Sequence, residues 1–310
     1  MKCLARWAWV ALVCGGLAFA QQAAGAGSGK GKAAVAEPTV VATPAMWRVT
    51  GPHGTAYLFG SIHVMKPNVD WETPKVKAAL AGSGVVYLEV ANLDDAAAVQ
   101  PLAMQYGLDK EHPLSTKISK EDVALLDAAA KGMGLPGEQV FEPMQPWLVS
   151  ASLQVLPMLK AGFAPSSGID TKLLAETKGQ QKPVRGFETM ADQIHMLADV
   201  PQAEQAELLH KELTELDKSA AQMQELVAAW ERGDVETIGK IDHEELAAKY
   251  PAEYKRMVVD RNTKWAATLD GLLKSPDAGT AFVIVGAAHL AGPDSVIKML
   301  EKDGYTVERE

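Results

Sequence analysis

Two segments of this 310-residue sequence carry the same short pattern, and this repetition restricts the fold more than any other feature. In each segment an apolar run is followed by Gly-x-x-His, which ends at His63 in the first copy and at His289 in the second. A helix-forming stretch and another short apolar run then follow in both copies. Two such units predict a duplicated half-domain whose two histidines are related by pseudo-symmetry.

The apolar segments of the chain predict a small sheet. Residues 46–50 and 55–59 flank the turn sequence Gly-Pro-His-Gly, so we expect them to form a β-hairpin. Short apolar runs are typical of buried strands in a largely parallel sheet. Four further strands are expected at residues 85–88, 182–187, 281–285 and 305–308.

Most of the remaining chain has helical periodicity. Ser119 and Asp122 form a capping signature before one helix, and further helices are expected at residues 143–160, 167–177 and 205–231. The apolar stripe of the last helix predicts a core-facing surface. The predicted fold is therefore α/β (α+β), with a small mixed, largely parallel sheet built from the duplicated strand-GxxH-helix-strand unit and a large helical insertion.

The N-terminal residues predict export. Lys2 and Arg6 precede an apolar run at residues 7–18, and Ala-Phe-Ala at 18–20 provides a cleavage site, so residues 1–20 are expected to be a signal peptide. The run is shorter than the roughly 18–20 apolar residues that span a bilayer. Residues 21–45 predict a flexible linker, and residues 46–310 a single domain located in the periplasm of a Gram-negative cell or secreted.

Composition excludes several functional classes. Both cysteines, Cys3 and Cys14, lie in the predicted signal peptide, so the mature chain would have no disulfide and no thiol nucleophile. The formal charge is −9, from 30 basic and 39 acidic residues, and it gives no electrostatic footprint for nucleic acid or anionic lipid. No integral membrane segment is expected once the signal is removed, and the oligomeric state is left open.

Four polar side chains follow predicted strands. His63, Glu89, Glu188 and His289 each come just after an apolar run, and the carboxyl ends of parallel strands meet at one edge of a sheet. Two imidazoles and two carboxylates without sulfur suit a divalent metal ion. Each residue alone has a simpler interpretation, as a satisfied loop histidine or a surface ion-pair partner. The repetition of the histidine favours a site.

Other motifs are absent or incomplete. His243 begins a zinc-protease-like pattern, but Ala247 stands where the second histidine is required. The chain has no Gly-x-Ser-x-Gly elbow, P-loop or dinucleotide-binding fingerprint. The remaining histidines are interpreted as ordinary: His53, His112, His195 and His210.

The combined motifs resemble the TraB/GumN family, part of the TIKI/TraB/PrgY superfamily of proteins regarded as metalloproteases. The chain is more distantly similar to erythromycin esterase-like and haem-binding ChaN-like proteins. One departure is Asp260, where the family usually has Glu before Arg-Asn. The matching segments are residues 58–63, 88–89, 168–170, 186–189, 260–265 and 285–292, in family order across the whole mature domain.

The resemblance implies a centre formed by His63, Glu89, Glu188 and His289. It also implies that Arg261 is a nearby cation that fixes a carboxylate ligand or a substrate carbonyl oxygen. The relatives favour a divalent ion, here Mn, Co or Zn.

Two functions therefore compete. The first is a metal-dependent hydrolase of peptide or other small acyl substrates, in which the ion polarises the carbonyl and activates water. Glu89 or Glu188 would act as a metal ligand or as the general base, and Arg261 would stabilise the oxyanion. The second is a non-catalytic periplasmic protein that sequesters metal, haem or peptide in the same pocket.

Overall fold

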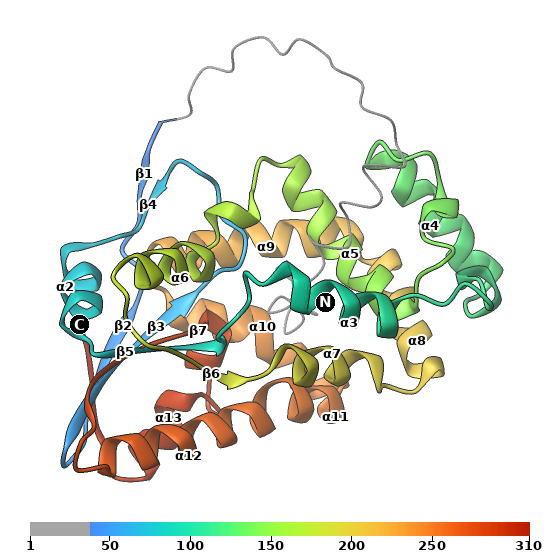
Figure 1. Ribbon diagram of the computed structural model, residues 1–310. Helices are drawn as coiled ribbons and strands as arrows, with labels where there is room; N and C mark the ends of the chain where they lie inside the picture. The colour runs from blue at the N-terminus through green and yellow to red at the C-terminus, as the bar shows by residue number, and fades with distance from the viewer. Residues whose placement is uncertain (1–37) are drawn as a thin grey trace.

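The computed structural model of the chain describes residues 38–310 (Figure 1). The predicted signal peptide and residues 21–37 of the predicted linker lie outside this range. Within the rest of that linker, strand β1 (Val40–Val41) pairs in parallel with β4 (Val69–Asp70), and Ala42 is fully buried. Across residues 38–310 no helix has both the length and the apolar character needed to cross a bilayer.

The main sheet has six strands in the order β6-β5-β7-β3-β2-β8. Strand β2 runs antiparallel to both of its neighbours, and the remaining pairs are parallel, so the predicted mixed, largely parallel sheet is confirmed. The strands are β2 (Met46–Thr50), β3 (Gly54–Ser61), β5 (Val85–Val90), β6 (Val184–Glu188), β7 (Gly279–Gly286) and β8 (Thr306–Arg309).

The two copies of the repeated pattern lie side by side. Strands β3 and β7 pair in parallel, with Gly60 opposite Val285 and Ser61 opposite Gly286. Helix α2 (Pro74–Gly82) connects β3 to β5 beyond β7, and α13 (Val296–Lys302) connects β7 to β8 beyond β3 and β2. Both Gly-x-x-His segments therefore leave the sheet at the same edge.

Helices cover both faces of the sheet, because successive side chains of a strand point to opposite sides. Leu58, Val283 and Val285 pack against α12 (Asp260–Lys274) and α13. Figure 1 shows these two helices on one side of the sheet, with α6 (Ile169–Gly179) and α9 (Leu216–Glu231) on the other.

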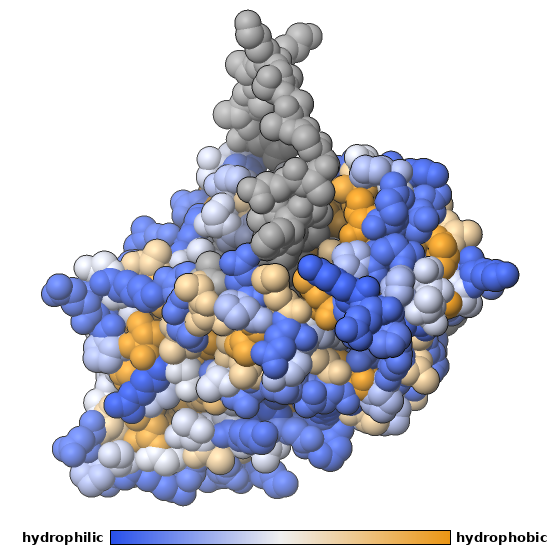
Figure 2. All heavy atoms as spheres, turned by 45° about the vertical axis from the view of Figure 1, so that its right-hand side comes forward, coloured by the Kyte–Doolittle hydropathy of each residue, from blue (hydrophilic) through white to orange (hydrophobic). Residues whose placement is uncertain are grey.

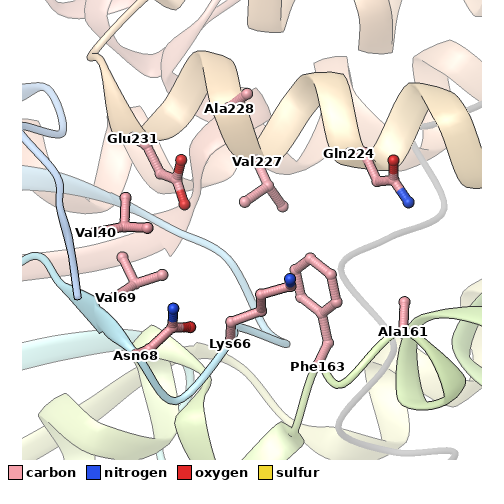
Figure 3. A pocket seen from close by; sticks show the side chains of 10 residues that line it. All are labelled: Val40, Lys66, Asn68, Val69, Ala161, Phe163, Gln224, Val227, Ala228 and Glu231. Carbon is pink, nitrogen blue, oxygen red and sulfur yellow. The ribbon is translucent and has the colours of Figure 1, made fainter. Parts of the chain in front are cut away.

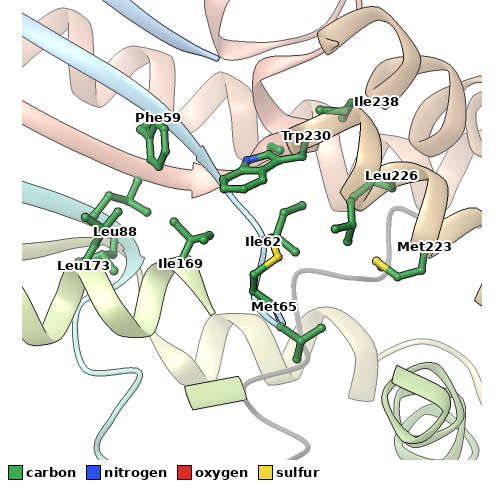
Figure 4. Packing of buried hydrophobic residues seen from close by; sticks show 14 of the residues in the cluster. Phe59, Ile62, Met65, Leu88, Ile169, Leu173, Met223, Leu226, Trp230 and Ile238 are labelled. Atoms are coloured by element: carbon green, nitrogen blue, oxygen red, sulfur yellow. The ribbon is translucent and has the colours of Figure 1, made fainter. Parts of the chain in front are cut away.

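The second face carries the larger core. Phe59 and Leu88 pack there with Leu173 of α6, Trp230 of α9 and Ile238 of α10 (Val235–Lys249) (Figure 4). The Trp230 Nε1 donates to the carbonyl oxygen of Gly60 at 2.7 Å, which satisfies the one polar atom of a buried indole. This bond joins α9 to the strand end that precedes His63.

The predicted helix over residues 205–231 is two helices. Helix α8 (Gln202–Thr214) and α9 meet at Glu215, although the apolar stripe continues through both. Leu209 and Leu213 pack with α4 (Lys120–Gly132) and α5 (Pro146–Lys160) in a third core cluster, whereas Met223 and Leu226 pack in the large core. The two halves of the expected helix therefore pack in different core clusters.

The remaining helices form the predicted insertion between β5 and β7, and the signature at Ser119 caps α4 as expected. These helices are α3 (Ala96–Gly107), α4 (Lys120–Gly132), α5 (Pro146–Lys160), α7 (Met190–Ala198) and α11 (Pro251–Tyr254). On the surface of the molecule, Figure 2 shows apolar side chains in small patches among polar ones.

Candidate functional site

The four predicted site residues lie at one edge of four adjacent strands. His63 follows β3, and His289 lies in a short 3₁₀ helix (Ala287–Leu290) directly after β7. Glu89 and Glu188 lie inside strand ends, because β5 and β6 extend slightly further than the apolar runs. The sheet thus brings the four residues to one side of the molecule.

Arg261 of α12 connects three of them. Its Nη2 donates to Glu89 Oε2 at 2.7 Å, and its Nε and Nη2 donate to the two oxygens of Glu188, each at 2.9 Å. Its Nη1 lies 2.9 Å from His289 Nε2. All three nitrogens of the guanidinium are therefore engaged within the protein, and their contacts fix carboxylates, one of the two roles that the resemblance left open.

Two further groups complete the environment of the glutamates. The backbone N–H of Gly286 donates to Glu89 Oε1 at 2.8 Å. Gln193 Nε2, on α7, donates to Glu89 Oε2 at 3.1 Å and to Glu188 Oε2 at 3.3 Å. Glu89 is buried and Glu188 is partly buried, and the oxygens of both carboxylates are hydrogen-bonded, as charges removed from water require.

The hydrogen bonds of His289 fix its tautomer. Asn262 Nδ2 donates to the carbonyl oxygen of Asp294, so its Oδ1, at 2.6 Å from His289 Nδ1, is an acceptor. His289 Nδ1 therefore carries the proton, and Nε2 accepts from Arg261. Burial first, and then the positive charge of Arg261, lower the pKa of His289 well below its usual value, so the ring is neutral.

His63 has an acidic partner on another helix. Its Nδ1 lies 2.6 Å from Oδ2 of Asp170 in the first turn of α6, and Ser61 Oγ donates to Oδ1 of the same carboxylate at 2.5 Å. Burial acts to lower the pKa of His63, but the charge and hydrogen bond of Asp170 outweigh it and raise this pKa to about 8. Burial likewise opposes ionisation of Asp170, yet His63 holds the pKa of that carboxyl below its usual value.

The Nε2 of His63 differs from the other polar atoms of this cluster. It is buried and has no hydrogen-bond partner within residues 38–310. Its side chain is 12% exposed, against 3% for Arg261 and 5% for His289. Leaving a buried imidazole nitrogen unbonded costs about 1–3 kcal/mol, so this atom is the natural contact for a group that comes from outside the chain.

The side chains of this site meet the requirements of a divalent metal ion only in part. The donor types are suitable, and His289 Nε2 and Glu89 Oε1 lie 3.9 Å apart. However, Arg261 already bonds His289 Nε2 and both glutamates. Residues 38–310 contain no group of three or more His, Cys, Asp or Glu side chains arranged to hold a metal. As they lie here, the residues do not fit a resident divalent ion.

Sequence reasoning missed several residues of this site. Asp170 and Asn262 lie in segments that carried the family resemblance, but no role was expected of them. Ser61 lies inside the first Gly-x-x-His motif, where its hydroxyl gave no separate signal. Gln193 lies on a helix with no distinguishing pattern.

The other histidines lie outside this network. His53 and His112 are exposed, and His195 and His210 form ion pairs with Asp199 and Asp122. His243 on α10 is buried, and its positive form contributes to the lowered pKa of His289. It lies close enough to the loop after His289 that a side chain at Gly292 would meet its ring.

A separate cavity of 420 Å³ lies between α9 and the loop after His63 (Figure 3). Lys66 and Phe163 line one side and Val227 and Glu231 of α9 another. It contains none of the predicted site residues, and no sequence pattern predicted it.

Comparison with known proteins agrees with this description of the chain. The model of the TraB/PrgY/gumN family matches residues 45–309. The chain belongs to this family. The match begins at the first strand of the hairpin and ends in β8, so the whole main sheet of this TraB/PrgY/gumN protein falls within the family's span.

Three similar proteins show how far the likeness extends. The uncharacterized protein YbaP of Escherichia coli K12 is 26% identical over 79% of this chain and 87% of its own length. An uncharacterized protein of Treponema pallidum is 25% identical over 83% of this chain and 80% of its own. The zebrafish protein named metalloprotease TIKI2 is 23% identical over 85% of this chain and 60% of its own. No solved structure is significantly similar to the chain.

Proposed function

We propose that this TraB/PrgY/gumN protein is an exported hydrolase that cleaves peptide or other acyl bonds at the site around His63. The observation that carries the proposal is the buried, unbonded Nε2 of His63, whose other ring nitrogen is held by Asp170, at the strand-end edge beside Glu89, Glu188 and Arg261. Active sites concentrate strained or unsatisfied groups, and parallel sheets bind ligands at this edge. The printed name of the zebrafish relative, a metalloprotease, supports the same class of reaction.

The predicted signal peptide supports export. Lys2, Arg6 and the apolar residues 7–18 form its first two parts, and Ala-Phe-Ala at 18–20 forms the third. We propose that the protein acts in the periplasm or outside the cell. Mass spectrometry of the protein recovered from the periplasm of a producing cell tests this, and an N-terminus at Gln21 is expected.

The sequence predicts that hydrolysis depends on a divalent metal ion, and the assay of hydrolysis must test this dependence. The residues expected to hold the ion, His63, His289 and the glutamates, do not fit one as they lie, because Arg261 already bonds His289 and both glutamates. A bound ion supplies Lewis-acid polarisation of a carbonyl and activation of water. The assay therefore includes divalent ions.

Hydrolysis by purified protein tests the function. Wild-type protein is incubated with a mixed peptide library and a panel of activated esters, with chelator or with Mn²⁺, Co²⁺ or Zn²⁺, and products are identified by mass spectrometry. Turnover is expected in the wild type and a loss of at least about 100-fold in His63→Ala, because removing a general base or a ligand costs this much. The matched control is His53→Ala, which changes an exposed histidine in the hairpin turn.

If folded wild-type protein cleaves nothing under any of these conditions, or if His63→Ala retains full turnover, another function must be sought.

A non-catalytic binding protein is the second candidate, and one observation favours it. Glu89, Glu188 and Arg261 satisfy one another, so the network leaves a single imidazole nitrogen available, as in a pocket that binds a ligand through one contact. Glu89→Gln and Glu188→Gln separate the two functions. A hydrolase is expected to lose turnover in at least one variant, whereas a binding protein never shows turnover but binds metal, haem or peptide through His63.

A further inference from the structure

Resting on the hydrolase function proposed above, we infer that His63 and Asp170 form a general-base dyad that activates water directly. Arg261 takes the place that a divalent cation would occupy between Glu89, Glu188 and His289. The hydrolysis then requires no metal ion, and Asp170 is the residue that positions its base.

The geometry of the dyad is built into the backbone. The segment that carries His63 runs alongside the segment that leads into α6, and the N–H of Ile169 donates to the carbonyl oxygen of Ile62 at 2.9 Å. Between them Gly168 allows a close approach, since a Cβ there would lie 2.1 Å from the carbonyl oxygen of His63. Asp170 therefore meets the ring of His63 because their main chains are joined.

The contacts of Asp170 serve orientation. One carboxylate oxygen accepts from Ser61 and the other from Nδ1 of His63, so the carboxylate has no rotational freedom left. A proton held on Nδ1 leaves the lone pair of the neutral ring on Nε2. A buried carboxylate at this nitrogen also stabilises the imidazolium that forms when Nε2 takes a proton.

The Nε2 of His63 faces a point that is free of side chain. A Cβ built on Gly286 would lie 3.2 Å from Glu89 Oε1, 3.5 Å from His289 Cδ2 and 4.0 Å from His63 Nε2. The glycine of the second Gly-x-x-His motif thus lets Glu89, His289 and His63 approach one another closely, and a side chain at this position would push Glu89 away from the site.

Arg261 supplies the positive charge that a metal ion would otherwise bring to this centre. Its charge compensates the two buried carboxylates, and the guanidinium stays protonated at all relevant pH values. A divalent ion bonded to His289 Nε2 would have to displace the Nη1 that lies 2.9 Å away and would then face a like charge. The glutamates are also poor candidates for the base, because their oxygens accept hydrogen bonds from Arg261, Gln193 and Gly286.

The proposed step balances in atoms and protons. Nε2 of His63 accepts a proton from water as the water oxygen bonds to the carbonyl carbon. The bond from that carbon to the leaving nitrogen or oxygen then breaks, and the leaving group takes the proton from Nε2. The products are a carboxylic acid and an amine or alcohol, and the ring returns to its starting state.

Chelation and metal counting test the inference. Full-length protein, processed by its host, is dialysed against chelator and then against mixed Mn²⁺, Co²⁺ and Zn²⁺. Hydrolysis and metal content are measured after each step. Turnover within about twofold of the untreated protein is expected throughout, with no metal that depends on His63 and His289. If chelation abolishes turnover and an ion restores it, or if near-stoichiometric metal is lost in His63→Ala and His289→Ala, the inference is overturned while the hydrolase function stands.

A second readout works without a substrate. Diethyl pyrocarbonate acylates unprotonated imidazole nitrogens, and mass spectrometry reports labelling of His63 as a function of pH. A midpoint near pH 8 is expected in the wild type, and a lower one in Asp170→Asn, because the carboxylate raises the pKa of His63. Ser61→Ala leaves the carboxylate in place, so it is expected to keep the midpoint near pH 8 and serves as the matched control.

The chelation and labelling experiments distinguish failure of the dyad from failure of the proposed hydrolase function. A His63 that resists labelling, or a midpoint unchanged by loss of the carboxylate, contradicts the dyad. Folded protein that labels as expected but hydrolyses nothing contradicts the proposed function instead.

Discussion

Arg261 Nη1 lies 2.9 Å from Nε2 of His289, so a guanidinium bonds the imidazole of the second Gly-x-x-His motif. The same guanidinium bonds Glu89 and Glu188. The two motifs are therefore equivalent in sequence but not in environment. His289 is neutral and accepts a hydrogen bond from the guanidinium, whereas His63 is hydrogen-bonded to the carboxylate of Asp170, which raises the pKa of His63.

Removal of the central cation should destabilise the fold. Arg261→Met leaves two buried carboxylates without their partner, and breaking a buried ion pair in this way costs about 3–5 kcal/mol. A fall in melting temperature of roughly 6–20 °C is expected at about 2–4 °C per kcal/mol. Adding Glu89→Gln and Glu188→Gln should recover part of the loss.

The matched control for Arg261 is an exposed arginine in a surface ion pair. Arg232→Met breaks a contact with Asp234 at 3.2 Å and should leave the melting temperature nearly unchanged. Equal losses in the two arginine variants would show that the central position of Arg261 is unimportant.

The close approach at Gly168 should be intolerant of a side chain. Gly168→Ala places a Cβ 2.1 Å from the carbonyl oxygen of His63, so the backbone must shift, at a cost of about 1–3 kcal/mol, and turnover should fall with the displaced dyad. Gly179→Ala, at the other end of α6, meets nothing within 4 Å and should be neutral or slightly stabilising. Thermal unfolding and turnover of both variants decide this, and equal behaviour would contradict the close approach.

Turnover should rise with pH. A general base must be unprotonated, and the pKa of His63 is about 8, so kcat/KM is expected to increase up to a midpoint near pH 8 and then level off. In Asp170→Asn the midpoint should move to lower pH, and kcat should fall by roughly 100-fold or more as orientation is lost. A pH–rate profile that is flat between pH 6 and 9 in the wild type would exclude His63 as the base.

Acid should destabilise the α4 cap. Ser119 and His210 lower the pKa of Asp122, with burial opposing them. A depressed carboxyl pKa adds stability that is complete above the unfolded value of about 4 and is lost as pH falls through the folded value. Urea unfolding of wild type and Asp122→Asn should therefore differ at pH 7, and the difference should shrink as pH falls below the unfolded value. A difference that persists at low pH would show that the ionised carboxylate is not its source.

Much of the framework followed from local patterns. The hairpin, the six strands of the main sheet and the shared edge of His63, Glu89, Glu188 and His289 were expected, because short apolar runs identify buried strands and parallel strands align their carboxyl ends. The small pair of β1 and β4 was not expected. The break at Glu215 was missed because the apolar stripe continues across it, although the two helices pack in different core clusters.

The contacts that define the chemistry were not available from the sequence. Asp170 is 107 residues from His63, and Arg261 is 172 residues from Glu89. Neither pair has a spacing rule, because their meeting depends on how α6 and α12 pack across the end of the sheet. Strand patterns alone identified four candidate residues and the edge of the sheet at which they meet. That a carboxylate contacts one histidine and a cation the other follows only from the tertiary structure, because the packing of α6 and α12 sets those distances.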